Sequence, residues 1–161
     1  MEIFLTLNTI ISLLIFGFVI LTIYLGIKIV PQSTEYVVER FGKYSKTLPA
    51  GLSIIVPYLD KIAHKISILE RQLKEFTISV ISRDNVEVKL ETTVFYRITD
   101  ASRSVYRIKD VESAINTAAT SIVRSAAGRL ELDELQSSRE SMNEEISKNL
   151  QEAAEVWGVD I

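Results

Sequence analysis

The sequence predicts an α+β protein that follows an apolar N-terminal helix. Three observations lead to this fold class: a first segment without charges, a middle part with the two-residue period of β-strands, and a last part with helical spacing. The 134 residues from Lys28 on are enough for one modest domain or two small ones. We expect a transmembrane anchor at 1–30, a β-rich membrane-proximal subdomain at 31–82 and an α/β subdomain at 83–161.

The N-terminal segment Ile3–Ile27 is uncharged over 25 residues, of which 18 are apolar. As a helix it would extend about 37 Å, which exceeds the roughly 30 Å hydrocarbon core of a bilayer. A secretory signal would be shorter and would start with positive charge, whereas only Glu2 precedes this segment. The segment is therefore interpreted as a retained anchor. It lacks proline, which favours a straight span over a re-entrant hairpin.

Basic residues beside the anchor bear on the orientation. No Lys or Arg precedes the segment, while Lys28, Arg40, Lys43 and Lys46 follow within about twenty residues, where the positive-inside bias acts. This favours a cytoplasmic body. The alternative stays open, because a large soluble body can translocate regardless of its charge.

Short strands are expected in the first part of the body. Residues 35–41 are β-rich and precede a turn at 42–45, and residues 52–56 are dense enough in β-branched side chains to predict a buried strand that Pro57 ends. Apolar residues alternate in 62–69 and again in 76–80. Together these segments predict a small barrel-like or open β unit.

Catalytic and cofactor chemistry finds little support in the sequence. Cysteine is absent, and His64, the only histidine, falls in phase with the apolar face of its strand, which predicts a half-buried packing residue rather than a metal ligand or base. No G-x-S-x-G, phosphate-loop or dinucleotide motif occurs, although spacing alone leaves a serine–lysine arrangement open. The acidic total argues against nucleic acid as a partner. We expect no cofactor, no metal and no enzyme activity.

The second part of the body is expected to alternate strand and helix. After a turn at Asp84-Asn85, residues 86–98 keep a period of two for thirteen residues, which predicts one long strand with one packed face. Residues 111–126 follow helical spacing, with Asp110 placed to cap the start and Gly128 to end the helix. Small side chains form one face of this helix: Ala114, Ala118, Ala119, Ala126 and Ala127.

A further helix is expected to start at Ser137, whose hydroxyl would cap it while Glu140 returns the bond. Its apolar stripe comprises Met142, Ile146, Leu150, Ala153 and Trp157. Residues 159–161 resemble the first half of a strand. We therefore expect the chain to be a fragment of a longer protein.

Charge is divided unequally along the chain. Residues 28–129 carry a net charge of +5 and residues 130–161 one of −7. A solvated helix surface would explain the acidic end. The alternative is a contact between copies of the chain, in which Glu144, Glu145 and Glu152 face Arg103, Arg107, Lys109 or Arg124 of the next copy.

A lipid-facing surface is expected between 28 and 74, where eight basic residues outnumber four acidic ones. The residues predicted to face the membrane are Lys43, Lys46, Leu48, Leu52 and Tyr58. The alternative for 52–56 is a plain core strand.

Motifs in a fixed order carry a family resemblance. They are Val30-Pro31-Gln32, Val38-Glu39-Arg40-Phe41-Gly42-Lys43-Tyr44, Pro49-Ala50-Gly51-Leu52, Val56-Pro57-Tyr58-Leu59-Asp60, Ser82-Arg83-Asp84-Asn85-Val86, Leu132-Asp133-Glu134-Leu135 and Trp157-Gly158-Val159. In this order they resemble the stomatin branch of the stomatin, prohibitin, flotillin and HflK/C (SPFH, band 7) superfamily, and within it the bacterial paraslipins.

The resemblance implies a protein that crosses the membrane once. For the paraslipins this membrane is the bacterial inner membrane. Such a protein is a scaffold subunit that forms a large homo-oligomeric ring or cage and organises a membrane microdomain. The alternative is an adaptor or regulator of a membrane protease, of the AAA type or a stomatin-operon serine protease with an NfeD-like partner. The chain departs from the family pattern in three respects: it lacks the central proline of eukaryotic stomatin anchors, it has no cysteine to palmitoylate, and the coiled coil of the family would lie beyond Ile161.

Overall fold

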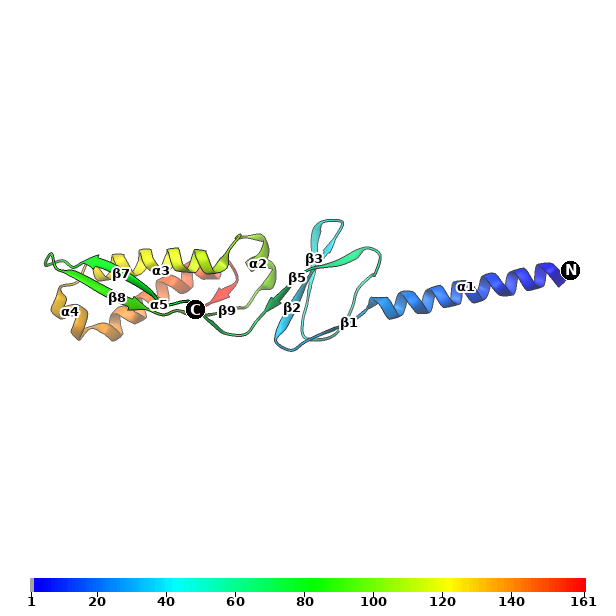
Figure 1. Cartoon of the computed structure of the whole chain (residues 1–161), viewed down its shortest axis with the longest axis horizontal. Helices are drawn as coiled ribbons and strands as arrows, with labels where there is room; N and C mark the ends of the chain where they lie inside the picture. Colours follow the sequence, from blue (N-terminus) through cyan, green and yellow to red (C-terminus); the bar gives the residue numbers. More distant parts are fainter. Residues whose placement is uncertain (1) are drawn as a thin grey trace. The chain divides into compact units, whose positions relative to one another are not determined.

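The computed structural model describes residues 2–161 and contains both helices and small sheets, which confirms the α+β class (Figure 1). It divides into two compact units, residues 1–66 and 67–161. The elements in chain order are α1 (Glu2–Gly26), β1 (Ile27–Val30), β2 (Thr34–Arg40), β3 (Lys43–Leu48), β4 (Gly51–Ile54), β5 (Asp60–Ser67), β6 (Arg71–Gln72), β7 (Phe76–Ile81), β8 (Glu87–Thr92), β9 (Phe95–Ile98), α2 (Ala101–Tyr106), α3 (Val111–Ala127), α4 (Leu132–Ser137), α5 (Arg139–Glu155) and β10 (Val159–Asp160).

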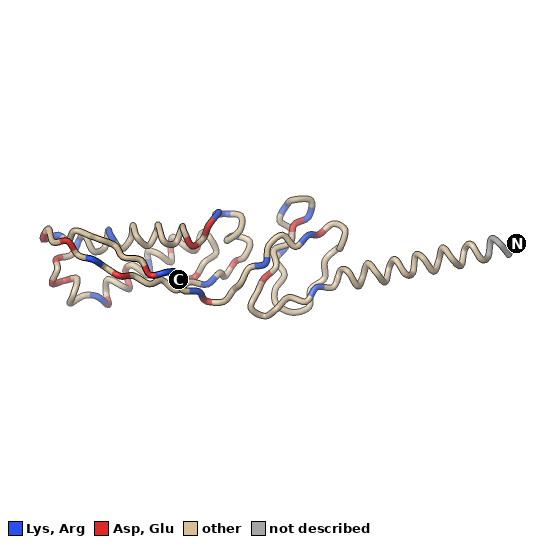
Figure 2. The backbone as a smooth tube through the Cα atoms, in the orientation of Figure 1, with Lys and Arg blue, Asp and Glu red and all other residues tan. Residues whose placement is uncertain are grey.

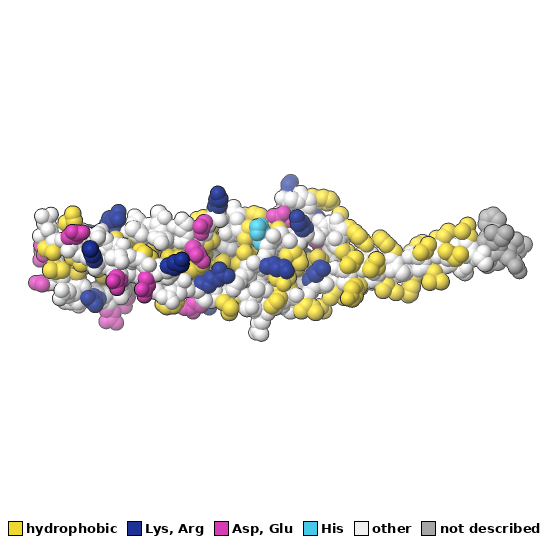
Figure 3. Space-filling model, in the orientation of Figure 1, with side chains coloured by type: hydrophobic (Ala, Val, Ile, Leu, Met, Phe, Trp, Pro, Cys, Tyr) yellow, Lys and Arg dark blue, Asp and Glu magenta, His cyan; other side chains and the backbone are white. Residues whose placement is uncertain are grey.

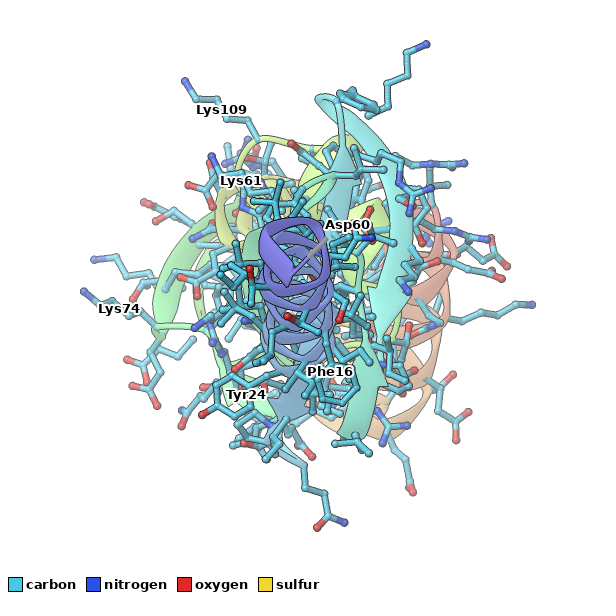
Figure 4. All side chains as sticks on the ribbon, turned by 90° about the vertical axis from the view of Figure 1, so that its right-hand side faces the viewer. Phe16, Tyr24, Asp60, Lys61, Lys74 and Lys109 are labelled. Carbon is cyan, nitrogen blue, oxygen red and sulfur yellow. The ribbon has the colours of Figure 1, made fainter. Side chains whose placement is uncertain are left out.

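The helix α1 is the apolar segment of the sequence. Its residues Thr6–Gly26 are long and apolar enough to cross a membrane by length and composition. Residues 6–26 of α1 include no charged side chain (Figure 2), and hydrophobic side chains follow one another along them (Figure 3). In the view along its axis, Phe16 and Tyr24 project outward from the helix (Figure 4). They are 66% and 75% exposed, so the described part of the protein leaves these two side chains uncovered.

The remainder of the first unit consists of two small sheets, in which β2 pairs with β3 and β1 with β4 in antiparallel fashion. One has the strand order β3-β2-β5, and the other pairs β1 with β4. A small core lies between them, made of Val30, Val38, Leu48 and Ile55. Phe41 and Gly42 form the tight turn before β3, and both have positive φ. Strand β3 begins at Lys43, inside the segment 42–45 for which the sequence predicted a turn.

Two expectations for the first unit were wrong. Residues 52–56 do not form a buried strand, because only Ile55 among them is buried while Leu52 and Ile54 are about 70% exposed. His64 is exposed on β5 and is not half-buried. Both errors concern which face of a strand the fold covers, which the alternation of residue types does not decide.

The second unit packs α3 and α5 against short strands. The hairpin β7–β8 pairs Phe76 with Thr92 and Ile81 with Glu87, and a second sheet has the order β10-β9-β6. The predicted face of Phe76, Ile78 and Val80 points inward. The subdomain boundary expected from the sequence, after residue 82, falls in the turn between β7 and β8. The two compact units of the structure divide after Ile66.

The long strand expected at 86–98 is two strands. β8 ends at Thr92 and β9 begins at Phe95, and between them the Leu73 N–H donates to the Val94 carbonyl at 2.8 Å. The alternation nevertheless continues through the break, since even-numbered residues from Val88 to Ile98 are buried or half-buried and odd-numbered ones are exposed. From Val88 on, the period of two predicted the faces correctly. Val86, which was expected on the packed face, is 37% exposed, and the interruption in pairing was not predicted.

The helix over 111–127 forms as expected. The carboxylate of Asp110 accepts the Ser113 N–H at 3.1 Å, and α3 ends at Gly128. Its buried residues include Ile115 and Val123 besides Ala119, Ala126 and Ala127, so it packs through larger side chains as well as the expected small ones.

The capping box expected at Ser137 was wrong. Ser137 ends α4, and its hydroxyl donates to the Asp133 carbonyl at 2.8 Å. The capping box lies earlier, where the Glu131 N–H donates to the Glu134 carboxylate at 2.9 Å. Helix α5 then starts at Arg139, and its apolar stripe faces inward as expected, with Ala154 more buried than Ala153.

Candidate membrane-binding surface

The pairing of β1 with β4 creates an exposed apolar face. In the antiparallel register Ile27 lies opposite Ile54 and Ile29 opposite Leu52. Residues that face each other across an antiparallel ladder project from the same side of it. Ile27 is 40% exposed and Ile54 69%, while Ile29 is 78% exposed and Leu52 72%. We call them the β1–β4 apolar face. Four large aliphatic side chains held together without cover are typical of a surface that meets a partner or a membrane.

The end of α1 is joined directly to this sheet. The Ile55 N–H donates to the Gly26 carbonyl at 2.9 Å. A Cβ on Gly26 would lie only 2.7 Å from the Ile55 carbonyl oxygen, so glycine permits this close approach. The β1–β4 apolar face therefore begins where the apolar helix ends.

The loop between β4 and β5 is shaped by the buried carboxylate of Asp60. Its Oδ2 accepts the Val56 N–H at 2.9 Å, and its two oxygens accept from the Arg40 guanidinium at 2.7 and 3.2 Å. The Arg40 hydrogen bonds, followed by that from Val56, lower the pKa of Asp60 below its usual range. The N–H groups of Leu59 and Asp60 also donate to the Val56 carbonyl, which closes the turn. The loop is thus fixed internally, with Tyr58 at its apex.

Tyr58 reaches down the side of α1. Its ring stacks on Phe18, with ring centroids 5.9 Å apart and an interplanar angle of 6°. Its hydroxyl lies 3.3 Å from the Thr22 hydroxyl. Because Thr22 already donates its only hydroxyl proton to the Phe18 carbonyl at 2.8 Å, Tyr58 is the donor. Thr22 and Phe18 lie four and eight residues before Gly26, so the loop descends roughly 6 to 12 Å along the helix.

The residues predicted from sequence to face the membrane fall in three environments. Leu52 and Tyr58 are exposed beside the end of α1, and Lys43 is exposed at the start of β3. Lys46 is half-buried, and its ammonium donates to the Ile54 carbonyl at 2.7 Å. Leu48 is only 2% exposed and belongs to the core, so it is not part of this surface.

Sequence reasoning missed Ile27, Ile29 and Ile54. Ile27 and Ile29 adjoin the anchor and were counted with it, and Ile54 was assigned to a buried strand. The available signal was the alternation of apolar residues with Lys28 and Ser53, which predicts a one-sided strand pair once β1 is recognised as a strand.

The residues expected at a contact between copies lie in the second unit. Arg103 pairs with Asp100 at 3.1 Å, Arg107 donates to the Val156 carbonyl at 3.3 Å, and Lys109 is exposed after α2. Arg124 lies in the last turn of α3, about 20 Å further along the helix axis, so these four residues do not form one patch.

The acidic partners lie along α5. Glu144 and Glu152 are exposed, while Glu145 forms an ion pair with Arg129 of the same chain. Within residues 2–161, no three His, Asp or Glu side chains lie together in a group that could hold a metal ion.

Comparison with known proteins supplies the family context. The model of the family described as "SPFH domain / Band 7 family" matches residues 28–161. An uncharacterized protein of Schizosaccharomyces pombe is 39% identical over 133 residues, 83% of this chain and 38% of its own length. The mitochondrial stomatin-like protein 2 of Homo sapiens is 35% identical over 130 residues, 81% of this chain and 36% of its own length.

An archaeal protein is also similar. An uncharacterized protein of Methanothermobacter thermautotrophicus is 32% identical over 152 residues, which cover 94% of this chain and 48% of the relative. The chain thus spans less than half the length of these three relatives.

Proposed function

The chain belongs to the SPFH domain / Band 7 family, in its stomatin branch, and on this premise we propose that it is a membrane-anchored scaffold subunit that assembles with copies of itself into a ring or cage and organises a membrane microdomain. Members of this family are generally membrane scaffold proteins rather than enzymes. The observation that carries the proposal is the continuity of α1, the β1–β4 apolar face and the loop with Tyr58.

In this proposal α1 crosses the bilayer and the first unit lies on the lipid at its C-terminal end. Residues 6–26 would extend about 32 Å, close to the thickness of the hydrocarbon core. The four side chains of the β1–β4 apolar face would enter the interface, where each contributes about 1–2 kcal/mol on leaving water. The loop with Tyr58 would then lie in the leaflet. Its phenol keeps a hydrogen bond there through Thr22, which an apolar environment requires.

We place the body on the cytoplasmic side. Support comes from Lys28, Lys43 and Lys46, which follow α1 closely while no basic residue precedes it. An impermeant maleimide applied to the outside of intact cells should leave a Ser45→Cys variant unlabelled and should label it after lysis. Labelling of intact cells would reverse the orientation.

Insertion of the β1–β4 apolar face is tested by depth-dependent quenching. The chain has no cysteine, so a fluorophore can be attached to a single Leu52→Cys or Ile29→Cys variant of the full chain in vesicles. Lipids that carry a nitroxide near the headgroup should quench both labels strongly. The matched reference is the same labelled variant in vesicles without nitroxide lipid, which should show no quenching. Unquenched labels at Leu52 and Ile29 in the nitroxide vesicles would contradict the proposal.

Assembly of copies is proposed to use opposite charges to set the register. A closed ring needs two different patches that meet, and the acidic outer side of α5 with the basic residues around α2 would supply such a pair. Exposed ion pairs contribute only about 0–1 kcal/mol each, so salt should loosen the assembly without abolishing it.

The test is sedimentation of full-length protein in which Glu144, Glu145 and Glu152 are changed to lysine. The expected result is a smaller oligomer or a changed salt response. The control replaces Glu70, Glu75 and Glu87 with lysine, which gives the same change in net charge away from α5. An unchanged size and salt response of the α5 variant would refute this interface.

A further inference from the structure

A hollow lies beside the C-terminal end of α1 in the first unit. It is lined by residues from the helix end, from β1, from the β4–β5 loop and from the start of β5: Leu25, Lys28, Ile55, Pro57, Tyr58, Asp60, Lys61 and Ile62. In the view along α1, Asp60 lies behind the helix, and Lys61 projects close to it (Figure 4). We call this depression the lysine hollow. Its wall is apolar toward Leu25 and Tyr58 and cationic at Lys28 and Lys61.

The two lysines of the hollow have no partner among the described residues. The ammonium group of neither Lys28 nor Lys61 forms a hydrogen bond, an ion pair or a contact with an aromatic ring there. The nearby carboxylate of Asp60 does not neutralise them, because both of its oxygens accept from Arg40 and its side chain is fully buried. The lysine hollow is therefore lined by two lysines whose positive charges no described carboxylate pairs with.

The position of the hollow relative to the apolar surface suits a lipid headgroup. Tyr58 reaches down α1 to the level of Thr22, whereas Lys28 comes two residues after Gly26. If the hydrocarbon ends near Gly26, Lys28 lies in the layer of headgroups that extends about 5–7 Å beyond it. An acyl chain could then pass along Leu25 and Tyr58 while its phosphate lies at the lysines.

We propose that the lysine hollow binds the phosphate group of an anionic phospholipid between Lys28 and Lys61. The proposal rests on the membrane attachment proposed above and adds a defined lipid site to it. A lysine near an anionic surface contributes about a five-fold gain in affinity, so loss of both should weaken binding roughly 30-fold. Free inorganic phosphate has the same phosphate chemistry but no acyl chain. Competition between the lipid and inorganic phosphate therefore distinguishes the two ligands.

The experiment uses the full chain in nanodiscs with equal amounts of phosphatidylglycerol and phosphatidylcholine. The protein is then released from the nanodiscs, and native mass spectrometry measures which of the two lipids stays bound to it. The wild type should retain phosphatidylglycerol preferentially, and a variant with Lys28→Gln and Lys61→Gln should lose the preference. Lys28→Arg with Lys61→Arg should keep it, since the charge remains. The matched control, Lys74→Gln with Lys89→Gln, removes two exposed lysines elsewhere and should keep it.

The outcomes separate the lipid site from the membrane attachment. Excess inorganic phosphate should not displace the lipid, and displacement would overturn the assignment to a phospholipid. Retained preference in the Lys28/Lys61 glutamine variant would also overturn it. Quenching of the Leu52 label in that variant reports insertion independently: normal quenching with an unchanged lipid preference refutes only the hollow, whereas absent quenching in the wild type refutes the proposed attachment.

Discussion

At Gly158 the backbone leaves no room for a side chain. Its φ is +71°, and a Cβ would lie 2.7 Å from the Asp100 Cβ and 2.8 Å from the Asp100 carbonyl oxygen. The Gly158 carbonyl accepts three hydrogen bonds, from the N–H groups of Thr99 and Asp100 and from the Thr99 hydroxyl, at 2.9 to 3.1 Å. Asp100 in turn caps α2 through the N–H groups of Ser102 and Arg103. The Trp157-Gly158-Val159 motif thus fixes the connection of β9 to α2.

We predict that Gly158→Ala destabilises the second unit by more than the roughly 1–2 kcal/mol of a left-handed residue, because the close contact with Asp100 adds to that cost. Gly42→Ala is the control: its φ of +77° is similar, but nothing lies within 4 Å of its Cβ position. Thermal unfolding of the full chain in detergent measures both, at about 4–8 °C per kcal/mol. Equal shifts for the two variants would contradict the crowding at Gly158.

In the first unit the Asp60 carboxylate holds the β4–β5 loop in place through its bonds to Val56 and Arg40, and its contribution to stability depends on pH. Its folded-state pKa is lowered, first by Arg40 and then by the Val56 N–H. The carboxylate therefore stabilises the fold above the unfolded pKa of about 3.9, and this contribution is lost as pH falls through the folded pKa.

We predict that Asp60→Asn lowers the melting temperature near neutral pH and that the gap to the wild type narrows below about pH 4. The pKa values of Asp84 and Asp100 are also lowered, but both residues titrate alike in the two proteins and cancel in the difference. Asn149→Ala, a change at an exposed polar residue of α5, should produce no gap that depends on pH. A gap for Asp60→Asn that stays constant down to about pH 3 would disprove the role of the carboxylate.

At the scale of elements, a glutamate pair caps the start of α4, whereas no side chain caps the start of α5. Glu134 accepts the Glu131 N–H at the start of α4, while the Ser137 hydroxyl bonds back to Asp133 within the same helix. Neither the Ser137 nor the Ser138 side chain caps α5. Helix α5 is therefore held by its inward stripe, with Leu150 only 2% exposed.

We predict that Glu134→Ala costs about 0.5–1 kcal/mol and that Ser137→Ala costs less than about 0.5 kcal/mol. The physical reason is that only the first change leaves an N-terminal N–H of a helix without its partner. Thermal unfolding in detergent compares the two. A larger loss for Ser137→Ala would restore the capping box that the sequence suggested.

At the scale of the whole molecule, attachment to lipid has two components of unequal strength. A transmembrane helix inserts irreversibly for practical purposes, whereas a surface with a few apolar and basic residues binds reversibly and responds to salt. The pairing of β1 with β4 also means that a variant without the anchor must retain residues from Ile27 on, since otherwise the β1–β4 apolar face is lost with it.

We predict that the chain from Ile27 to Ile161 binds anionic vesicles at low salt and is released by high salt, while the full chain stays in the membrane fraction under both conditions. Vesicle sedimentation measures both proteins. The control adds Ile29→Asn and Leu52→Asn to the shortened chain and should reduce its binding. Failure of the unsubstituted shortened chain to bind at low salt would leave α1 as the sole attachment.

The sequence by itself determined the features that depend on neighbouring residues. The continuous apolar composition of α1, the alternation at Phe76–Val80 and from Val88 to Ile98, and the start of α3 at Asp110 are local patterns, and the structure contains each of them. The family was also predicted from the sequence alone, because its motifs are short segments in a fixed order along the chain.

Only the tertiary structure decided which faces are covered. Leu48 is buried and Leu52 exposed although both are leucines in short strands, because β3 pairs with β2 over the core while β4 pairs with β1 at the end of α1. The lysine hollow likewise joins Lys28 and Lys61, which are far apart in sequence. Strand partners and registers are set by contacts between distant segments, and a period of two states that a strand has two faces without stating which one the fold buries.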